Sequence, residues 1–269
     1  MSVLISPTAL ADDKDCIVFD CRFSLMDKNA GRQAYIAGHI PGARFVDLER
    51  DLSSTPGAGG RHPLPDPAAL AARLRSLGVN DDSRLVCYDQ NSGAVAGRFW
   101  WLVRWLGHAD VRILDGGLDA WVAAGLPVDA KGVHPVPGHF SLRTPLTRTV
   151  TAEQILDDPA TLLDAREAAR YRGEVEPIDP VAGHIPGAIS APFADNLEDG
   201  RFKSSAALRE RFAALGIDDD SAVACYCGSG VTAAHNIAAM LIAGFPEPAL
   251  YPGSWSEWIA DAGRPVVKA

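Results

Sequence analysis

One six-residue segment occurs twice in the chain, and this repeat constrains the fold more than any other feature of the sequence. Gly-His-Ile-Pro-Gly-Ala occupies residues 38–43 and again residues 183–188, an offset of 145 residues (183 − 38). Four further pairs of segments match in the same order: 18–22 with 162–166, 85–89 with 222–227, 116–121 with 253–258, and AGLPV around Gly125 with AGRPV around Gly263. Five landmarks in one order indicate a duplicated domain of about 130 residues.

The two copies are separated by a stretch rich in proline. Residues 131–149 contain three prolines and no helical periodicity, so they are interpreted as a linker. We therefore predict a first domain over residues 1–130 and a second over residues 150–269. The length of 269 residues and the 47% hydrophobic content suit two globular domains.

Within each copy, short apolar runs rich in strand-forming residues alternate with helix-like stretches. The predicted strands are Cys16–Cys21, Arg84–Tyr88, Val111–Leu114, Thr161–Asp164, Ala222–Tyr226 and Ala249–Tyr251. The predicted helices include Pro67–Leu77, Gly97–Leu106, Ser204–Leu215 and Thr232–Ala243. This alternation predicts an α/β fold, with a parallel sheet covered by helices on both faces in each domain. Reactive residues then belong in the loops that follow the strands.

The overall charge limits the partners. A formal charge of −9 disfavours nucleic acid and anionic membrane surfaces, which are bound by clustered Lys and Arg. The first residues do not resemble a signal peptide, and no stretch approaches the roughly 20 apolar residues that span a bilayer. We expect a cytoplasmic protein without a membrane or nucleic-acid partner, and a small anionic substrate remains compatible with local cations.

The five cysteines do not form a disulfide framework or a metal site. Their number is odd and their spacing irregular, so we expect reduced thiols. The pair Cys225 and Cys227 has C-x-C spacing, which fits neither a redox C-x-x-C dithiol nor a zinc site. Four cysteines lie within apolar strands and are expected to be structural: Cys16, Cys21, Cys87 and Cys225.

Comparison of the two copies separates structural from functional candidates. Residues present in both are more simply explained by the shared fold: Asp20, Arg22 and His39 in the first copy, and Asp164, Arg166 and His184 in the second. The Asp-Arg pairs follow a strand and suit a turn with an ion pair. Each histidine precedes Ile-Pro-Gly and suits a hydrogen-bonded structural role, and His39 is also kept as a candidate active-site residue.

The copies differ where the second has Cys227 and the first has Asp89. Residues 228–230 (Gly-Ser-Gly) can curl so that successive N–H groups point inward, and Thr232 opens the next predicted helix with its N-terminal dipole. Such a nest lowers the pKa of a thiol and stabilises a thiolate, while Ser229 and Thr232 supply hydroxyl groups. The alternative is a buried structural cysteine.

Arg170 is the second single-copy feature. At an offset of 144 it corresponds to Met26, so the fold does not require a cation there. A guanidinium can hold a carboxylate or sulfonate-like group by two-point contacts, which makes Arg170 the candidate anion ligand. The alternative is a solvated loop arginine, which Arg172 fits better.

These residues resemble the rhodanese and 3-mercaptopyruvate sulfurtransferase family across essentially the whole chain. The resemblance rests on both GHIPGA segments, on residues 251–258 (YPGSWSEW) and on the loop 227–232 (CGSGVT). It implies two tandem rhodanese-like domains, a catalytically inactive first one and a catalytic second one whose site faces the cleft between them. No metal and no organic cofactor are implied.

The resemblance also implies a ping-pong cycle in which Cys227 takes a sulfur atom as a persulfide and passes it to cyanide or a thiol. Ser229 would assist proton movement, with His39 as a candidate partner. The implied substrate-binding residues are Arg170, Gly228, Gly230, Val231 and Thr232. A thioredoxin-like protein is a candidate thiol acceptor.

The identity of the donor is less determined. The CGSGVT loop is similar to that of 3-mercaptopyruvate enzymes, whereas thiosulfate enzymes typically have a more cationic loop. However, residues 176–180 (EPIDP) stand where mercaptopyruvate enzymes usually have a second substrate arginine. A thiosulfate:cyanide sulfurtransferase is therefore the alternative, followed by a non-enzymatic binding or regulatory module. Phosphatase chemistry is disfavoured because Ala233 replaces the arginine of a Cys-x5-Arg loop.

Overall fold

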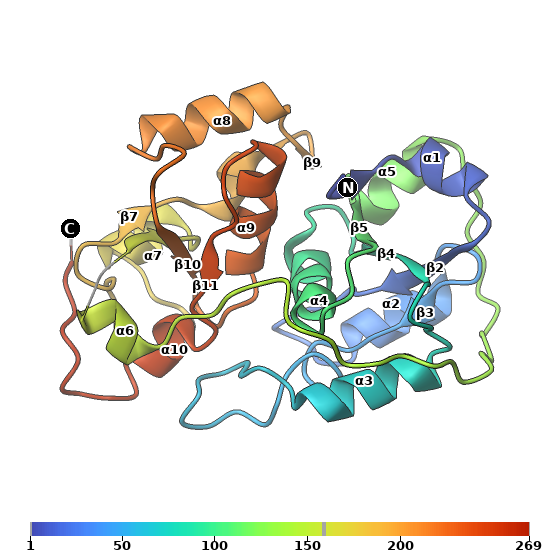
Figure 1. Ribbon diagram of the computed structural model, residues 1–269, viewed down its shortest axis with the longest axis horizontal. Coiled ribbons are helices and arrows are strands. Elements are labelled where there is room, and N and C mark those ends of the chain that lie inside the picture. Colours follow the sequence, from blue (N-terminus) through green and yellow to red (C-terminus); the bar gives the residue numbers. More distant parts are fainter. Residues whose placement is uncertain (1, 158–159, 269) are drawn as a thin grey trace. The chain divides into compact units, whose positions relative to one another are not determined.

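The computed structural model describes residues 2–157 and 160–268, which form two compact units (Figure 1). The first unit contains the chain up to Ser54 together with Leu64–Leu146. The second contains Thr55–Pro63 and the chain from Thr147 onward. A short segment of the first half of the sequence thus belongs structurally to the second unit, whereas the repeat alone predicts two continuous domains.

The first unit is built on a five-stranded parallel sheet. Its strands are β1 (Leu4–Ile5), β2 (Cys16–Asp20), β3 (Arg44–Phe45), β4 (Arg84–Tyr88) and β5 (Val111–Leu114), in the order β1-β5-β4-β2-β3. Its helices are α1 (Pro7–Asp12), α2 (Ala30–Ala37), α3 (Pro67–Ser76), α4 (Ala94–Trp105) and α5 (Gly117–Ala123). Side chains alternate between the two faces of β2. Val18 therefore packs with Leu10 of α1 and Trp121 of α5, while the ring of Phe19 lies tilted against that of Phe99 of α4, with 4.7 Å between the ring centroids.

The second unit has a four-stranded parallel sheet in the order β11-β10-β6-β7. These strands are β6 (Thr161–Asp164), β7 (Ile189–Ser190), β10 (Val223–Tyr226) and β11 (Ala249–Leu250), and β8 (Leu197–Glu198) pairs antiparallel with β9 (Arg201–Phe202). The helices are α6 (Ala152–Asp157), α7 (Ala168–Arg172), α8 (Ser205–Ala214), α9 (Ala233–Ile242), α10 (Ser254–Trp258) and the 3₁₀ turn η1 (Phe193–Asn196).

Helices cover both faces of this sheet (Figure 1). On one face, Ile155 of α6 and Trp255 and Trp258 of α10 pack into the cluster that contains Tyr226. On the other face lie α8 and α9, which pack against each other and bury Phe212. The predicted α/β class, with parallel sheets covered on both faces, is confirmed.

The helices and strands differ from the predicted ones mainly at their ends. Helix α4 begins at Ala94 rather than at Gly97, because the carboxylate of Asp89 accepts hydrogen bonds from the backbone N–H groups of Val95 and Ala96. An acceptor from outside the helix thereby satisfies donors that have no intrahelical partner. Arg170, expected in a loop, lies in the one-turn helix α7. None of the described helices is both long and apolar enough to cross a membrane.

Candidate active site

Cys227 directly follows β10, at the carboxyl end of the second sheet. Its backbone is fixed from both sides: its N–H donates to Oγ of Ser254 at 3.1 Å, and its carbonyl accepts from the N–H of Trp255 at 2.9 Å. The hydroxyl of Ser254 in turn donates to the carbonyl of Tyr251 at 2.9 Å. Ser254 has φ of 53°, a left-handed conformation that a non-glycine residue adopts at a cost. Helix α10 therefore positions the residue that carries the thiol.

Asp89 occupies the equivalent place in the first unit. The carbonyl of Asp89 accepts from the N–H of Leu118 at 3.0 Å, just as that of Cys227 accepts from Trp255. Its carboxylate accepts hydrogen bonds from the N–H groups of Gly93, Val95 and Ala96 at 2.9 to 3.2 Å. Burial raises the pKa of the Asp89 carboxyl, although these N–H groups favour its ionised form. The loop after this strand can thus surround an anion with backbone donors.

The loop after Cys227 requires glycine at position 230, and at position 228 it lies close to two arginine side chains. Gly230 has φ of 75°, and a Cβ there would lie 2.3 Å from the carbonyl oxygen of Pro252. A Cβ on Gly228 would lie 3.0 Å from a terminal nitrogen of Arg61 and 3.6 Å from one of Arg170. Two guanidinium groups therefore approach the backbone of the residue next to the thiol. The sequence predicted one of these arginines.

Ser229 contacts a histidine that the sequence analysis missed. Its Oγ lies 2.8 Å from Nδ1 of His62, and both residues are buried. His62 belongs to the segment 55–63, which packs on α10: the N–H of Arg61 donates to Oγ of Ser256 at 3.0 Å. Gly60 approaches so closely that a Cβ would lie 2.8 Å from the carbonyl oxygen of Gly253. This segment brings a histidine and an arginine to the loop of Cys227.

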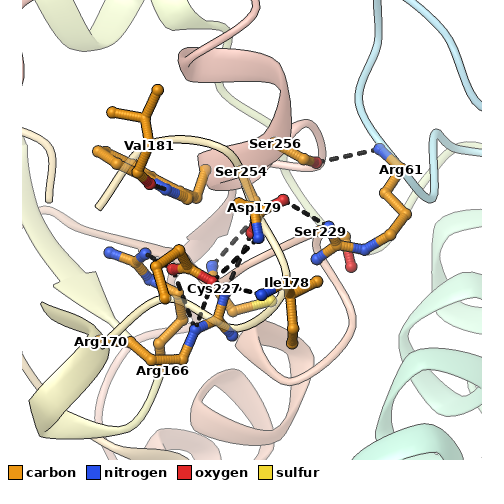
Figure 2. A network of polar contacts seen from close by, with 12 residues as sticks. Arg61, Arg166, Arg170, Ile178, Asp179, Val181, Cys227, Ser229, Ser254 and Ser256 are labelled. Atoms are coloured by element: carbon orange, nitrogen blue, oxygen red, sulfur yellow. Dashed lines mark hydrogen bonds and ion pairs between the residues drawn. The ribbon is translucent and has the colours of Figure 1, made fainter. Parts of the chain in front are cut away.

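Two carboxylates engage the arginines (Figure 2). Nε and Nη2 of Arg170 donate to the carboxylate of Glu176 at 2.7 to 3.1 Å, and Nη2 also donates to Oδ2 of Asp179 at 3.0 Å. Nη1 of Arg61 pairs with Oδ1 of Asp179 at 2.5 Å. Asp179 therefore joins the two cations. Arg172, by contrast, is exposed and pairs with Glu174.

Val231 and Thr232 complete the loop that the sequence predicts to bind substrate. Val231 is buried, and Thr232 caps α9 without a hydrogen bond from its side chain to the helix. The loop thus passes from the thiol into the amino end of α9, as expected from the pattern Gly-Ser-Gly before a helical stretch.

The residues present in both copies make the same contacts in both. Arg22 binds Asp20 through Nε and Nη2, and Arg166 binds Asp164 in the same way. The rings of the repeated histidines stack on tyrosines and bond their carbonyls: His39 with Tyr35, at 2.7 Å to its oxygen, and His184 with Tyr171, at 2.8 Å. These shared contacts support structural roles, and His39 lies in the first unit.

The remaining four cysteines have raised pKa values. All five thiols are free, and burial raises the pKa of Cys21, Cys87 and Cys225, whereas burial and the neighbouring Asp13 raise the pKa of Cys16 to about 11. These four therefore stay protonated at neutral pH. Within residues 2–157 and 160–268, no group of three His, Cys, Asp or Glu side chains could hold a metal ion.

Comparison with known proteins agrees with this geometry. The family model described as the rhodanese-like domain matches residues 8–124 and again residues 149–261. The chain belongs to the rhodanese family. Among its relatives, a probable 3-mercaptopyruvate sulfurtransferase of Pseudomonas aeruginosa is 53% identical over 96% of this chain and 94% of its own.

Two further members of the rhodanese family extend this comparison. A putative thiosulfate sulfurtransferase of Mycobacterium tuberculosis is 46% identical, over 93% of this chain and 89% of its own. The solved structure of the 3-mercaptopyruvate sulfurtransferase from Leishmania major superposes with a TM-score of 0.85 at 31% identity, covering 96% of this chain and 74% of that one. Relatives named for either sulfur donor are therefore similar to this chain.

Arg61 and His62 could have been recognised by one signal in the sequence. Between GHIPGA and the following helix, the first copy is longer than the second and contains Gly-Ala-Gly-Gly-Arg-His at residues 57–62. A glycine-rich insertion that carries a histidine in only one copy is open to function by the same argument that singled out Arg170.

Proposed function

We propose that this rhodanese transfers a sulfur atom from 3-mercaptopyruvate to cyanide or a thiol through a persulfide on Cys227. The observation that carries the proposal is the convergence on the Cys227 loop of Arg61, Arg170 and the Ser229–His62 pair. In the first unit Asp89 holds the equivalent place, so that unit has no thiol at this position. The relatives named for 3-mercaptopyruvate support the choice of donor.

In the first half-reaction, the thiolate of Cys227 attacks the sulfur of the donor. The S–S bond of the persulfide forms as the C–S bond of mercaptopyruvate breaks, and the bonding electrons leave with the carbon as the enolate of pyruvate, which takes up a proton. In the second half-reaction, cyanide or a thiolate attacks the outer sulfur. That step restores the Cys227 thiolate and releases thiocyanate or a new persulfide.

The backbone of the loop supports the charged states of this cycle. At the equivalent place in the first unit, the side chain of Asp89 accepts three hydrogen bonds from backbone N–H groups. Its carboxylate there occupies the position that the thiolate would have in the second unit. We infer that the N–H groups after Cys227, with the amino end of α9, stabilise its thiolate and persulfide in the same way. Gly228 and Gly230 allow the close approach that such a nest needs.

The pair of Ser229 and His62 supplies a route for the proton. Nδ1 and Oγ share one hydrogen bond of 2.8 Å, so the imidazole can accept a proton from the hydroxyl or return one. Ser229 lies two residues after Cys227 in the tight loop. We assign this pair to proton transfer between the thiol group and the departing enolate.

The arginines bind the other end of the donor. A guanidinium holds a carboxylate by two parallel hydrogen bonds, and terminal nitrogens of both Arg61 and Arg170 lie beside Gly228. Arg61 thus supplies a second cation, although residues 176–180 lack the arginine expected there. Thiosulfate is the second candidate donor, favoured by the relative named for it.

Sulfur transfer to cyanide, measured as thiocyanate, tests the proposal with both donors side by side. We expect a higher kcat/KM for 3-mercaptopyruvate, and incubation with the donor alone should add one sulfur atom to the mass of the protein. Cys227→Ser should abolish turnover and the added mass without changing thermal unfolding, while Cys225→Ser is the matched control that keeps both. A wild-type protein inactive with either donor would favour the binding or regulatory module.

A further inference from the structure

Asp179 contacts both arginines of the candidate site at once. Its Oδ1 lies 2.5 Å from Nη1 of Arg61, and its Oδ2 accepts from Nη2 of Arg170 at 3.0 Å (Figure 2). Its side chain is only 4% exposed, so water and salt screen these contacts weakly. The carboxylate thus makes the contacts with two guanidinium groups that the anionic end of a bound substrate would make.

The loop that carries Asp179 is held at both ends. Oε1 of Glu176 accepts from the N–H of Asp179 at 3.1 Å, while the same carboxylate binds Arg170. Burial opposes ionisation of Glu176, but the hydrogen bonds from Arg170 and from the Asp179 backbone outweigh it and lower the pKa of Glu176. Further along, Nε1 of Trp255 donates to the carbonyl of Val181 at 2.8 Å. Asp179 is therefore part of an ordered buried network.

The charges of this network determine which anions it can accept. Arg61 and Arg170 pair with Glu176 and Asp179, and Arg166 joins the network through Glu176 while its own charge is balanced by Asp164. The formal charges of the network therefore cancel. A substrate anion must share the guanidinium groups with Asp179. The Coulomb repulsion between Asp179 and the substrate is proportional to the substrate's charge, so a dianion is repelled about twice as strongly as a monoanion at the same distance.

We propose that Asp179 determines donor specificity by disfavouring dianionic sulfur donors relative to donors held through a single carboxylate. Arg61 and Arg170 attract the donor anion, and the negative charge of Asp179 partly offsets this attraction. This inference rests on the proposed function, since it concerns the donor site of the same reaction. It assigns a specificity role to a residue of the EPIDP segment at positions 176–180.

The direct test is Asp179→Asn, which removes the charge and nearly preserves the shape. We expect the ratio of kcat/KM for thiosulfate to that for 3-mercaptopyruvate to rise about tenfold, the change that follows when one buried repulsion is lost. Asp179→Glu should keep the wild-type ratio. The matched control is Glu174→Gln, which removes an exposed charge of the same loop. It should leave kcat/KM unchanged for both donors.

Two results would overturn the inference. One is an unchanged ratio in a folded Asp179→Asn protein, including an equal loss with both donors, which would indicate a purely structural role. The other is a fall in the ratio of thiosulfate to 3-mercaptopyruvate kcat/KM. If thermal unfolding shows that Asp179→Asn does not fold, Asp179→Ser provides the same loss of charge in a smaller side chain.

Binding of inert anions separates this inference from the proposed function. Sulfate and pyruvate stand in for the dianionic and the single-carboxylate ligand, and each is titrated as a stabiliser in thermal unfolding, which needs no turnover. In Asp179→Asn, sulfate should bind about tenfold more tightly than in the wild type, whereas the affinity for pyruvate should increase by a smaller factor. Equal gains for both anions would refute the role of Asp179. Absence of sulfur transfer by the wild-type protein would instead refute the proposed function.

Discussion

Replacement of Ser254 tests whether α10 positions Cys227 for the proposed reaction. The hydroxyl of Ser254 accepts the N–H of Cys227 at 3.1 Å and donates to the carbonyl of Tyr251 at 2.9 Å, and Ser254 is fully buried. In Ser254→Ala, the buried N–H of Cys227 loses its acceptor, which costs about 2 kcal/mol of unfolding free energy. The alanine also keeps the left-handed backbone, with φ of 53°.

In Ser254→Gly, the same hydrogen bonds are lost but the backbone strain is relieved. A left-handed conformation costs a non-glycine residue about 1 kcal/mol or more, so the glycine variant should be about 1 kcal/mol more stable than the alanine variant. Both should lower kcat/KM about tenfold, because one of the two hydrogen bonds that position the backbone of Cys227 is lost. The order of stability and the loss of activity therefore have different physical causes.

Thermal unfolding and thiocyanate formation provide the assays. We expect the wild type to have the highest melting temperature, Ser254→Gly a lower one and Ser254→Ala the lowest. Sulfur transfer should be reduced in both variants. The residue equivalent to Ser254 in the first unit is Gly117. In Gly117→Ala a Cβ would lie 2.6 Å from the carbonyl oxygen of Asp89, so this variant should have a lower melting temperature than the wild type. Full activity in Ser254→Gly, or an alanine variant more stable than the glycine variant, would refute the reasoning.

Three further predictions concern the other members of the site. His62→Asn should slow persulfide formation about a hundredfold, measured in single-turnover experiments, whereas a proton route independent of His62 would leave the rate unchanged. Arg170→Lys cannot reproduce the two-point contact with Glu176, so KM for 3-mercaptopyruvate should rise about tenfold; an unchanged KM would exclude Arg170 from donor binding. Because the folded pKa of Glu176 is lowered, its contribution to stability is present above its ordinary pKa of 4.5 and is lost as the pH falls through the folded value. The melting temperature of Glu176→Gln should accordingly depend less on pH below 4.5 than that of the wild type.

The repeat and the strand-helix alternation predicted the fold class and the place of the thiol. Cys227 could be singled out because its equivalent in the first copy is aspartate, a difference that is visible without any structure. The repeat likewise predicts structural roles for the shared Asp-Arg pairs and histidines, and their matching contacts in the two copies agree with such roles. Short elements were harder to predict: two-residue strands such as β3 and β7 depend on pairing with β2 and β6 rather than on their own composition.

The partners of the site could not be predicted in full. His62 lies 167 residues from Ser229 in the sequence, and no local pattern links the two. Likewise, the position of Arg170 in a single-copy segment identified a cation, but not its pairing with Glu176 and Asp179. Hydrophobic periodicity indicates which face of an element is buried, whereas contacts between distant loops depend on the tertiary fold.

The segment 55–63 has a consequence for the duplicated gene. The first copy, which has Asp89 in place of Cys227, supplies Arg61 and His62 to the unit that contains Cys227. A chain divided between the two copies would therefore separate Arg61 and His62 from Cys227. During synthesis, His62 is made long before Cys227, and Cys227 gains its last backbone partner only when Trp255 is in place. The nascent chain thus completes the backbone contacts of Cys227 only after residue 255 has been added.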